Sequence, residues 1–166
     1  MRLIGLDPGL RNTGWGIIDF IENKITWIAS GTISPKTNVT LPERLRTIHE
    51  EVSKILEKYN PNSGAIEEIF VNKNPQATLK LGMARGAAIT ACSVNNIYLK
   101  EYSPTVIKQA VTGTGRASKD QIGAMLKILL PGCNYSSNDE SDALAIAICH
   151  THFTQYNIKN IEEFKI

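Results

Sequence analysis

Cysteine is scarce in this chain of 166 residues, and the three that occur, Cys92, Cys133 and Cys149, lie far apart. An odd number of widely spaced cysteines fits neither a disulfide framework nor the short paired spacings of a structural zinc site. The length suits one domain that buries an ordinary hydrophobic core without such staples. We therefore expect a reduced protein with a single core.

Long hydrophobic runs are also missing. No stretch approaches the roughly 20 apolar residues that a membrane-spanning helix needs. The N-terminus reads directly as a strand and lacks the charged, apolar and cleavage-site succession of a signal peptide. The sequence therefore predicts a soluble, cytoplasmic protein with no membrane partner.

A strong excess of charge of either sign is absent, because the formal net charge is +2, and this value alone indicates no class of partner. The charge is unevenly distributed, however. Seven cations and one acid, Glu101, lie between Val71 and Lys119, whereas five acids and two lysines lie between Cys133 and Ile166. The cations of the basic stretch are Lys73, Lys80, Arg85, Lys100, Lys108, Arg116 and Lys119.

The first part of the chain predicts three antiparallel strands, since it is rich in β-branched and aromatic residues separated by turn signals. The predicted strands are 1–7, 13–20 and 24–34. Asp7 is followed by Pro8 and Gly9, which enforce a turn. Gly14 and Gly16 interrupt the second strand, and a glycine there often marks the close approach of another backbone or a ligand.

Helices and strands alternate in the rest of the chain. Thr40 with Glu43 and Ser118 with Gln121 have the form of capping boxes, and Asn138 is a candidate cap for the last helix. The predicted helices are 40–60, 74–93, 103–113, 118–129 and 139–155, and the further strands are 64–70 and 97–102. This order predicts an α/β domain over 1–156, with a five-stranded mixed sheet, its first three strands antiparallel, and helices on both faces. Residues 157–166 are expected to form a loosely ordered tail.

Four acidic residues are candidates for one site. Asp7 ends the first predicted strand, and Glu67 lies in an otherwise apolar strand. Asp139 and Asp142 lie three residues apart in the first turn of a predicted helix, so they share a face. With this element order, we expect the strand ends and that helix face to point toward a common region.

Each acid also has a purely structural explanation. Asp before Pro-Gly is a common turn residue. Glu67 could pair with a core Arg or Lys or reach water at a strand end, and a helix dipole favours acids in a first turn. The dipole does not explain, however, why Asp139 and Asp142 share a face directed at two other acids.

Converging carboxylates repel one another unless cations hold them, and an all-oxygen donor set suits Mg²⁺ or Mn²⁺ better than zinc. We therefore predict that Asp7, Glu67, Asp139 and Asp142 hold two Mg²⁺ ions, for which Mn²⁺ can substitute. Such a pair of ions would activate water and stabilise the leaving oxygen in phosphodiester hydrolysis.

Basic residues near these acids are candidates for contacts with phosphate. Lys119 begins a helix after a Gly-rich loop, and Lys108 lies on the preceding short helix. Either lysine could stabilise charge at a scissile phosphate, although each could also be an ordinary solvated side chain. Contacts with the phosphates of DNA are predicted for Lys73, Lys80, Arg85, Lys108, Arg116 and Lys119.

Phenylalanine and histidine side chains near these acids have more than one possible role. Phe70, just beyond Glu67, could belong to the core or could stack on an unpaired base. His150 and His152 do not share a helix face, so core or surface packing is a better interpretation than metal binding.

Several motifs occur together in a fixed order. They are Ile4–Gly9 with Thr13–Gly16, Ala65–Phe70, Leu79–Gly82 with Ala84–Gly86, Val106–Gln109 and Asp139–Ala145. With them the chain resembles, almost from end to end, the RuvC family of bacterial Holliday-junction resolvases. The ordered set is far more specific than any one motif, because an Asp-containing Gly-rich turn alone would also fit actin-like ATPases.

That resemblance implies an RNase H-like fold, a homodimer and Mg²⁺-dependent nicking of two opposed strands of a four-way DNA junction at a short consensus. It implies cooperation with a branch-migration complex of a junction-binding protein and an ATP-driven motor. By the same resemblance, Asp7, Glu67, Asp139 and Asp142 are metal-binding catalytic acids, Lys108 and Lys119 are basic helpers, and Phe70 stacks on a base. The short acidic end departs from the basic tail of some members, which puts a tail-dependent grip on DNA in doubt.

A dimer also has a physical rationale, because a symmetric pair of subunits places two active sites on a roughly two-fold symmetric junction. The helix predicted at 74–93 is a candidate interface, since its small residues would let another helix approach closely. Packing of that helix on its own sheet is the competing explanation.

Three other functions fit parts of the sequence. A related nuclease acting on RNA or an RNA/DNA hybrid could use the same acids. A non-cleaving junction-binding module would leave the four acids without a purpose. An actin-like ATPase would need two related halves, and 166 residues supply one.

Overall fold

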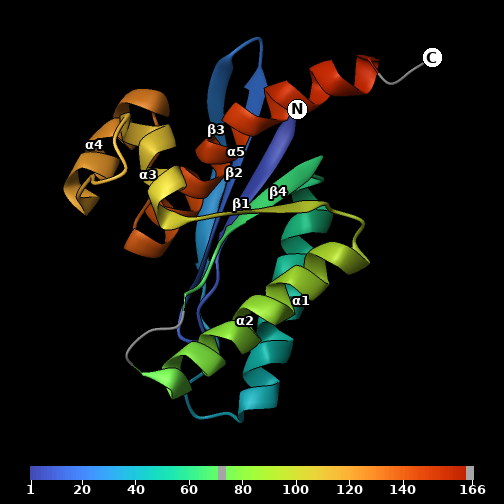
Figure 1. The fold of residues 1–166 in the computed structure, drawn as a ribbon. Coiled ribbons are helices and arrows are strands. Elements are labelled where there is room, and N and C mark those ends of the chain that lie inside the picture. Colours follow the sequence, from blue (N-terminus) through green and yellow to red (C-terminus); the bar gives the residue numbers. More distant parts are fainter. Residues whose placement is uncertain (71–73, 164–166) are drawn as a thin grey trace.

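The computed structural model of the chain describes residues 1–70 and 74–163 (Figure 1). Its five-stranded sheet has the order β3-β2-β1-β4-β5. The strands are β1 (Arg2–Asp7), β2 (Thr13–Ile21), β3 (Lys24–Ile33), β4 (Ser63–Glu67) and β5 (Leu99–Tyr102). β1, β2 and β3 pair antiparallel, whereas β4 is parallel to β1 and β5 is parallel to β4. The predicted mixed sheet with three antiparallel strands is therefore confirmed.

Five helices cover the two faces of this sheet. They are α1 (Leu41–Tyr59), α2 (Pro75–Val94), α3 (Pro104–Thr112), α4 (Lys119–Leu129) and α5 (Asn138–Glu163). α1 and α2 lie on one side of the sheet, and α3, α4 and α5 lie on the other (Figure 1). The prediction of helices on both faces is also confirmed.

The alternation of side chains along β1 divides the core into two layers. Leu3 packs with α3, α4 and α5, whereas Ile4 and Leu6 pack with α1 and α2. Successive side chains of a strand point to opposite faces. Asp7 therefore follows Leu3 and Gly5 onto the α5 face, and this is the face where the acids meet.

The capping signals were read correctly for α1 and α4. Thr40 and Glu43 form the capping box of α1, and Ser118 and Gln121 form that of α4. The cap predicted for α5 is wrong by one residue. The Ser137 hydroxyl, not the Asn138 side chain, accepts the hydrogen bond from the backbone N–H of Glu140 at 3.1 Å.

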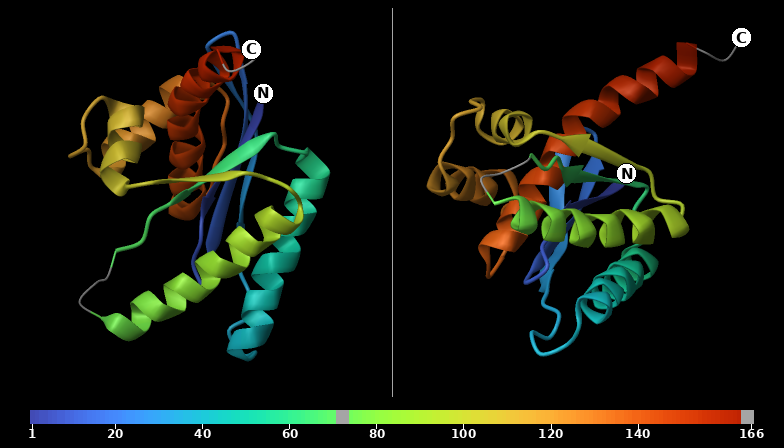
Figure 2. Two further views of the ribbon diagram at one scale, coloured as in Figure 1. Left: turned by 45° about the vertical axis from the view of Figure 1, so that its right-hand side comes forward. Right: turned by 60° about the horizontal axis from the view of Figure 1, so that its bottom comes forward.

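Two predicted ends are also wrong. β4 ends at Glu67 and does not reach Phe70, so Glu67 is a strand-end residue. α5 continues past Gln155 to Glu163, because the chain beyond Gln155 contains no Pro or Gly to stop it. Its C-terminal part projects beyond the rest of the molecule (Figure 2). Within the described ranges, no helix combines the length and apolarity needed to cross a membrane.

Candidate active site

Two neighbouring parallel strands, β1 and β4, place Asp7 and Glu67 at the same end of the sheet. Leu6 of β1 lies opposite Ile66 of β4. Asp7 and Glu67 are the next residues of these strands, so their side chains lie next to each other at the carboxyl ends. Because Ala65 packs on the α5 side and side chains alternate, Glu67 points to that side, as Asp7 does.

α5 supplies the other two acids because it packs directly onto β1 and β2. A Cβ atom on Gly14 would lie 1.9 Å from the backbone oxygen of Asp139, and one on Gly5 would lie 2.0 Å from that of Ala143. Neither contact is possible, so only glycine allows the helix this close. The strand glycine Gly14 therefore marks a close approach of another backbone, as predicted.

A buried carboxylate that the sequence analysis did not single out fixes the start of α5. Glu140 is 5% exposed, and its carboxylate accepts hydrogen bonds from Ser136 at 2.7 Å and from Ser30 of β3 at 2.9 Å. The Ser137 hydroxyl also lies 2.9 Å from that of Thr32. These bonds tie the first turn of α5 to the sheet. The Ser137-to-Glu140 spacing of a capping box was the signal that could have revealed them.

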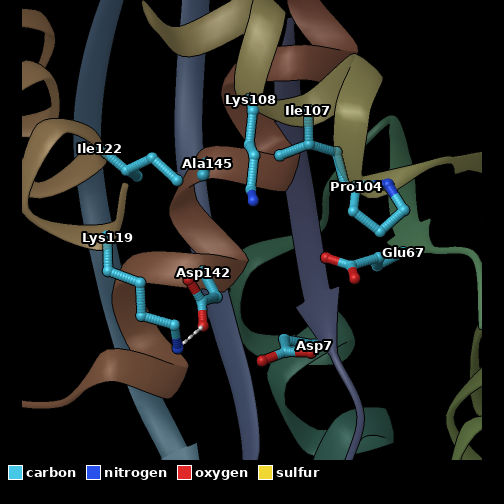
Figure 3. A pocket seen from close by; sticks show the side chains of 9 residues that line it. All are labelled: Asp7, Glu67, Pro104, Ile107, Lys108, Lys119, Ile122, Asp142 and Ala145. Carbon is cyan, nitrogen blue, oxygen red and sulfur yellow. Dashed lines mark hydrogen bonds and ion pairs between the residues drawn. The ribbon is translucent and has the colours of Figure 1, made fainter. Parts of the chain in front are cut away.

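Acids and lysines surround one cavity of about 280 Å³. Asp7, Glu67 and Asp142 point toward its centre from β1, β4 and α5, while Lys108 and Lys119 enter from α3 and α4 (Figure 3). Three of the four predicted acids thus line the same space. The fourth, Asp139, lines a neighbouring cavity.

The acids are close enough to perturb one another. The pKa of Asp7 is raised to about 7, first because burial disfavours its charge and then because Asp142, Glu67 and Asp139 repel it. Burial and the charge of Asp142 also raise the pKa of Glu67. The charge of Asp139 thus contributes to the raised pKa of Asp7, although Asp139 lines the neighbouring cavity. Part of this cluster is therefore protonated near neutral pH unless a cation compensates its charge.

Lys119 provides part of that compensation. Its Nζ lies 3.2 Å from a carboxylate oxygen of Asp142 (Figure 3). Lys108 and Lys119 oppose the upward shift of the Glu67 pKa, so both ammonium groups act on the acids. The lysine side chain of this pair is largely exposed, which limits its contribution to stability.

The donor set suits a hard divalent cation. It consists of carboxylate oxygens alone, and its members repel one another across a shared cavity. Within residues 1–70 and 74–163, no three acidic, His or Cys side chains already stand in a ligating arrangement.

The predicted DNA-contacting residues differ in their surroundings. Phe70 is 64% exposed, and Lys80 and Arg116 are also exposed. Lys73 lies outside the described residues. Arg85 is only 14% exposed at its side chain, where it pairs with Glu101 at 2.7 Å and donates from Nε to the backbone oxygen of Glu67 at 3.2 Å. The Arg85 side chain is therefore already engaged with Glu101 and the Glu67 backbone and is mostly shielded from solvent.

His150 belongs to the core, as expected, and is 4% exposed. Its ring nitrogens lie 3.0 Å from the Ser63 hydroxyl and 2.9 Å from the Tyr102 hydroxyl. These contacts connect α5 with β4 and β5. They leave the ring no free nitrogen for a metal.

Comparisons with known proteins agree with this geometry. Residues 3–150 match the family described as crossover junction endodeoxyribonuclease RuvC. The curated protein of that name from Paramagnetospirillum magneticum is 49% identical over 152 residues, which cover 92% of both chains.

Solved structures give the same result. The structure of Thermus thermophilus RuvC in complex with a Holliday junction substrate has a TM-score of 0.88, with 27% identity over 95% of this chain and 96% of that chain. The yeast mitochondrial Holliday junction resolvase has a TM-score of 0.69, with 13% identity over 98% of this chain and 83% of that one, and supports the fold alone. The RNase H-like fold is thereby confirmed.

Proposed function

The chain belongs to the RuvC family of crossover junction endodeoxyribonucleases, and on this premise we propose that it resolves four-way DNA junctions by paired symmetric nicks. This activity serves homologous recombination and DNA repair. The observation that carries the proposal is the gathering of Asp7, Glu67 and Asp142 around one cavity beside Asp139. A non-cleaving binding module has no use for such a costly cluster of repelling carboxylates.

Asp7, Glu67, Asp139 and Asp142 would hold divalent cations, preferably two Mg²⁺ ions, for which Mn²⁺ could substitute. Bound ions of this kind lower the pKa of water and stabilise the leaving oxygen of a phosphodiester. The all-oxygen donor set and the raised pKa of Asp7 support this assignment. With ions bound there, the four carboxylates would be held in their ionised form, because the cations would offset their mutual repulsion.

The two lysines act on the phosphate itself. Lys119 pairs with Asp142 in the free protein, and release of this pair frees its ammonium group for the phosphate. Lys108 enters the same cavity from α3 (Figure 3). A cation fixed beside the reacting phosphate stabilises the negative charge that grows in the transition state.

DNA lies across the surface around this cavity. Phe70 stacks on an unpaired base at the junction centre, and its 64% exposure supports that role. Lys80 and Arg116, both exposed, and Lys73 neutralise phosphates. Arg85 instead holds the backbone of Glu67, since its side chain is engaged and nearly covered.

The active form is a homodimer that pairs through α2. Leu79 is 65% exposed and Met83 is 46% exposed, and a Cβ added to Gly86 would meet nothing within 4 Å. These positions are three or four residues apart, so they form one apolar, open stripe. The dimer works with a branch-migration complex of a junction-binding protein and an ATP-driven motor.

A panel of labelled substrates tests the proposed activity. The protein is incubated with a four-way junction, a linear duplex and an RNA/DNA hybrid of matched sequence in Mg²⁺. Cleavage of the junction alone is expected. Preferred cleavage of the hybrid would assign the same acids to a related nuclease acting on RNA, and binding without cleavage of any substrate would reject a nuclease.

A further inference from the structure

A second cavity, of about 490 Å³, lies beside the active site and is basic where the first is acidic. It is lined by the loop 9–12 between β1 and β2, by the first turns of α1 and α2, and by Asp139 at the start of α5. Three cations, Arg11, Arg44 and Lys80, line it, and Asp139 is the one acid among its described lining residues. The sequence analysis singled out neither Arg11 nor Arg44.

The loop that forms one wall is held in place before any ligand binds. The buried Thr13 hydroxyl donates to the backbone oxygen of Gly9 at 2.9 Å and accepts from the Gly9 N–H at 3.2 Å. Ser34 donates to the side-chain oxygen of Asn12 at 3.0 Å. Since the loop starts two residues after Asp7, its position relative to the catalytic cavity is fixed.

Arg44 reaches this wall from α1. One of its terminal nitrogens donates to the backbone oxygen of Leu10. Its Nε is buried and has no hydrogen-bond partner in the described part of the chain. No ion pair there uses Arg44, so its positive charge lacks a carboxylate partner. An uncompensated guanidinium that is partly withdrawn from water favours an anion nearby.

The two cavities lie at the same end of β1, because Asp7 ends this strand and lines the first cavity, and the loop that follows lines the second. Asp139 lines the basic cavity, and its charge raises the pKa of Asp7 in the catalytic one. DNA carries a negative charge at short, regular intervals along each strand. A strand that places one phosphate at the acidic cavity therefore has other phosphates close by. The carboxylates of the catalytic cavity repel these neighbouring phosphates. Cationic side chains beside that cavity would offset the repulsion.

We propose that Arg11, Arg44 and Lys80 form a subsite for a non-scissile backbone phosphate of the junction, next to the cavity where the strand is cut. This inference rests on the proposed function and adds a defined phosphate contact to it. The subsite holds the strand in register while the carboxylates engage the neighbouring phosphate. It offsets the repulsion between those carboxylates and the DNA.

Salt-dependent binding tests the subsite without any cleavage. The affinity for a fluorescent four-way junction is measured without divalent ions, between 50 and 200 mM salt, for the wild type, Arg11→Ala and Lys80→Ala. Both side chains are exposed, so these variants are expected to fold. The affinity falls as salt rises, and each lost phosphate contact makes the slope of log affinity against log salt less steep by about 0.9. The affinity lost between the two salt concentrations therefore becomes about threefold smaller.

Arg46→Ala is the matched control. Arg46 lies two residues from Arg44 on α1, is 69% exposed and makes only a solvated pair with Glu50 at 3.7 Å. Its removal is expected to leave the slope unchanged. Slopes of Arg11→Ala and Lys80→Ala that equal those of the wild type and of Arg46→Ala would overturn the subsite.

Neutral methylphosphonate linkages, introduced one at a time, locate the phosphate. At one linkage near the cut, neutralisation is expected to weaken binding of the wild type and Arg46→Ala by severalfold but to leave the Arg11→Ala, Lys80→Ala double variant unaffected. An equal effect on all proteins at every linkage would refute the subsite. A wild type that binds the junction but does not cut it in Mg²⁺ would contradict the proposed nuclease and still leave the subsite measurable.

Discussion

Asp7 is the residue whose charge depends most on its neighbours. Its pKa is raised to about 7 in the folded protein, from 3.8 for an unperturbed side chain. The folded state therefore binds more protons than the unfolded state between about pH 4 and pH 7, and stability falls as the pH rises through that window. Without divalent ions, the ionised Asp7 carboxylate therefore lowers the free energy of unfolding at pH 8.

Asp7→Asn removes this cost together with the catalytic group. The variant is expected to melt several degrees above the wild type at pH 8 in a chelator, since roughly 2–4 °C accompanies each kcal/mol in a chain of this size. The difference should shrink at pH 5, where wild-type Asp7 is protonated. Equal or lower Tm of the variant at pH 8, measured by calorimetry, would show that the carboxylates do not repel one another as described.

His150 gives a dependence of the opposite sign. Burial lowers its pKa to about 4 from 6.5, so the unfolded state binds more protons between these values and stability is lost as the pH falls through them. The loss amounts to about 3 kcal/mol across the window. Tyr102 and Ser63 hold the neutral ring.

Comparison with His150→Gln isolates this dependence, because the contribution of Asp7 is common to both proteins. The wild type is expected to be the more stable at pH 7.5, by denaturant titration, and to lose most of that advantage by pH 4.5. A constant difference in unfolding free energy between the two pH values would show that His150 does not stay neutral in the folded state.

The candidate site was predictable where an acid stands out from its local pattern. Asp7 precedes a Pro-Gly turn, Glu67 interrupts a predicted apolar strand, and Asp142 lies three residues after Asp139 near the start of a helix, so local signals singled out each of them. Arg11 and Arg44 had no such signal. More than thirty residues separate them, and only the docking of α1 against the loop 9–12 brings them together.

At the scale of elements, the first turn of α5 decides whether the acids meet. Glu140 joins this turn to β3 through Ser30 and to the preceding loop through Ser136. A helix start held by several bonds keeps the backbone of Asp139 and Asp142 in position without a bound cation. If the first turn were frayed, a cation would have to order it on binding, and the conformational entropy lost would weaken cation binding.

Glu140→Ala is therefore expected to weaken metal use more than DNA binding. The substitution removes the acceptor of the part-buried hydrogen bonds from Ser30 and Ser136 and should cost about 1–3 kcal/mol of stability. The Mg²⁺ concentration for half-maximal cleavage should rise severalfold while junction affinity without metal stays unchanged. Glu57→Ala, at an exposed position of α1, is the matched control. An unchanged Mg²⁺ requirement would limit Glu140 to a purely structural role.

Element prediction succeeded where side chains near in sequence determine the boundary. The capping boxes at Thr40 and Ser118 were read correctly because both partners lie three residues apart. The start of α5 was misread because Ser137 and Asn138 are both good caps, and tertiary bonds to Glu140 favour Ser137. The strand end at Glu67 was missed since Ile69 and Phe70 are again apolar, although the pairing with β5 has ended at Glu67.

At the scale of the whole molecule, the proposed dimer would set how many strands are cut together. Leu79→Glu places a charge in the open stripe of α2 and is expected to give a monomer by sedimentation at micromolar concentration. Ile128→Glu, on α4, changes an equally exposed apolar residue, at 68% against 65%, and should leave a dimer. A wild type that sediments as a monomer, or a Leu79→Glu protein that remains a dimer, would contradict the α2 interface.

Paired cleavage of a mobile four-way junction tests the central claim most directly. The junction is labelled on each of its four strands in turn and incubated with and without Mg²⁺, and the cut positions are mapped for the wild type and for Glu67→Gln. The account predicts symmetric nicks in two opposed strands with the wild type in Mg²⁺ alone. It also predicts no nicks with Glu67→Gln, whose affinity for the junction stays close to that of the wild type. Equal cleavage by Glu67→Gln, or wild-type cleavage that needs no divalent ion, would contradict a nuclease built on these carboxylates.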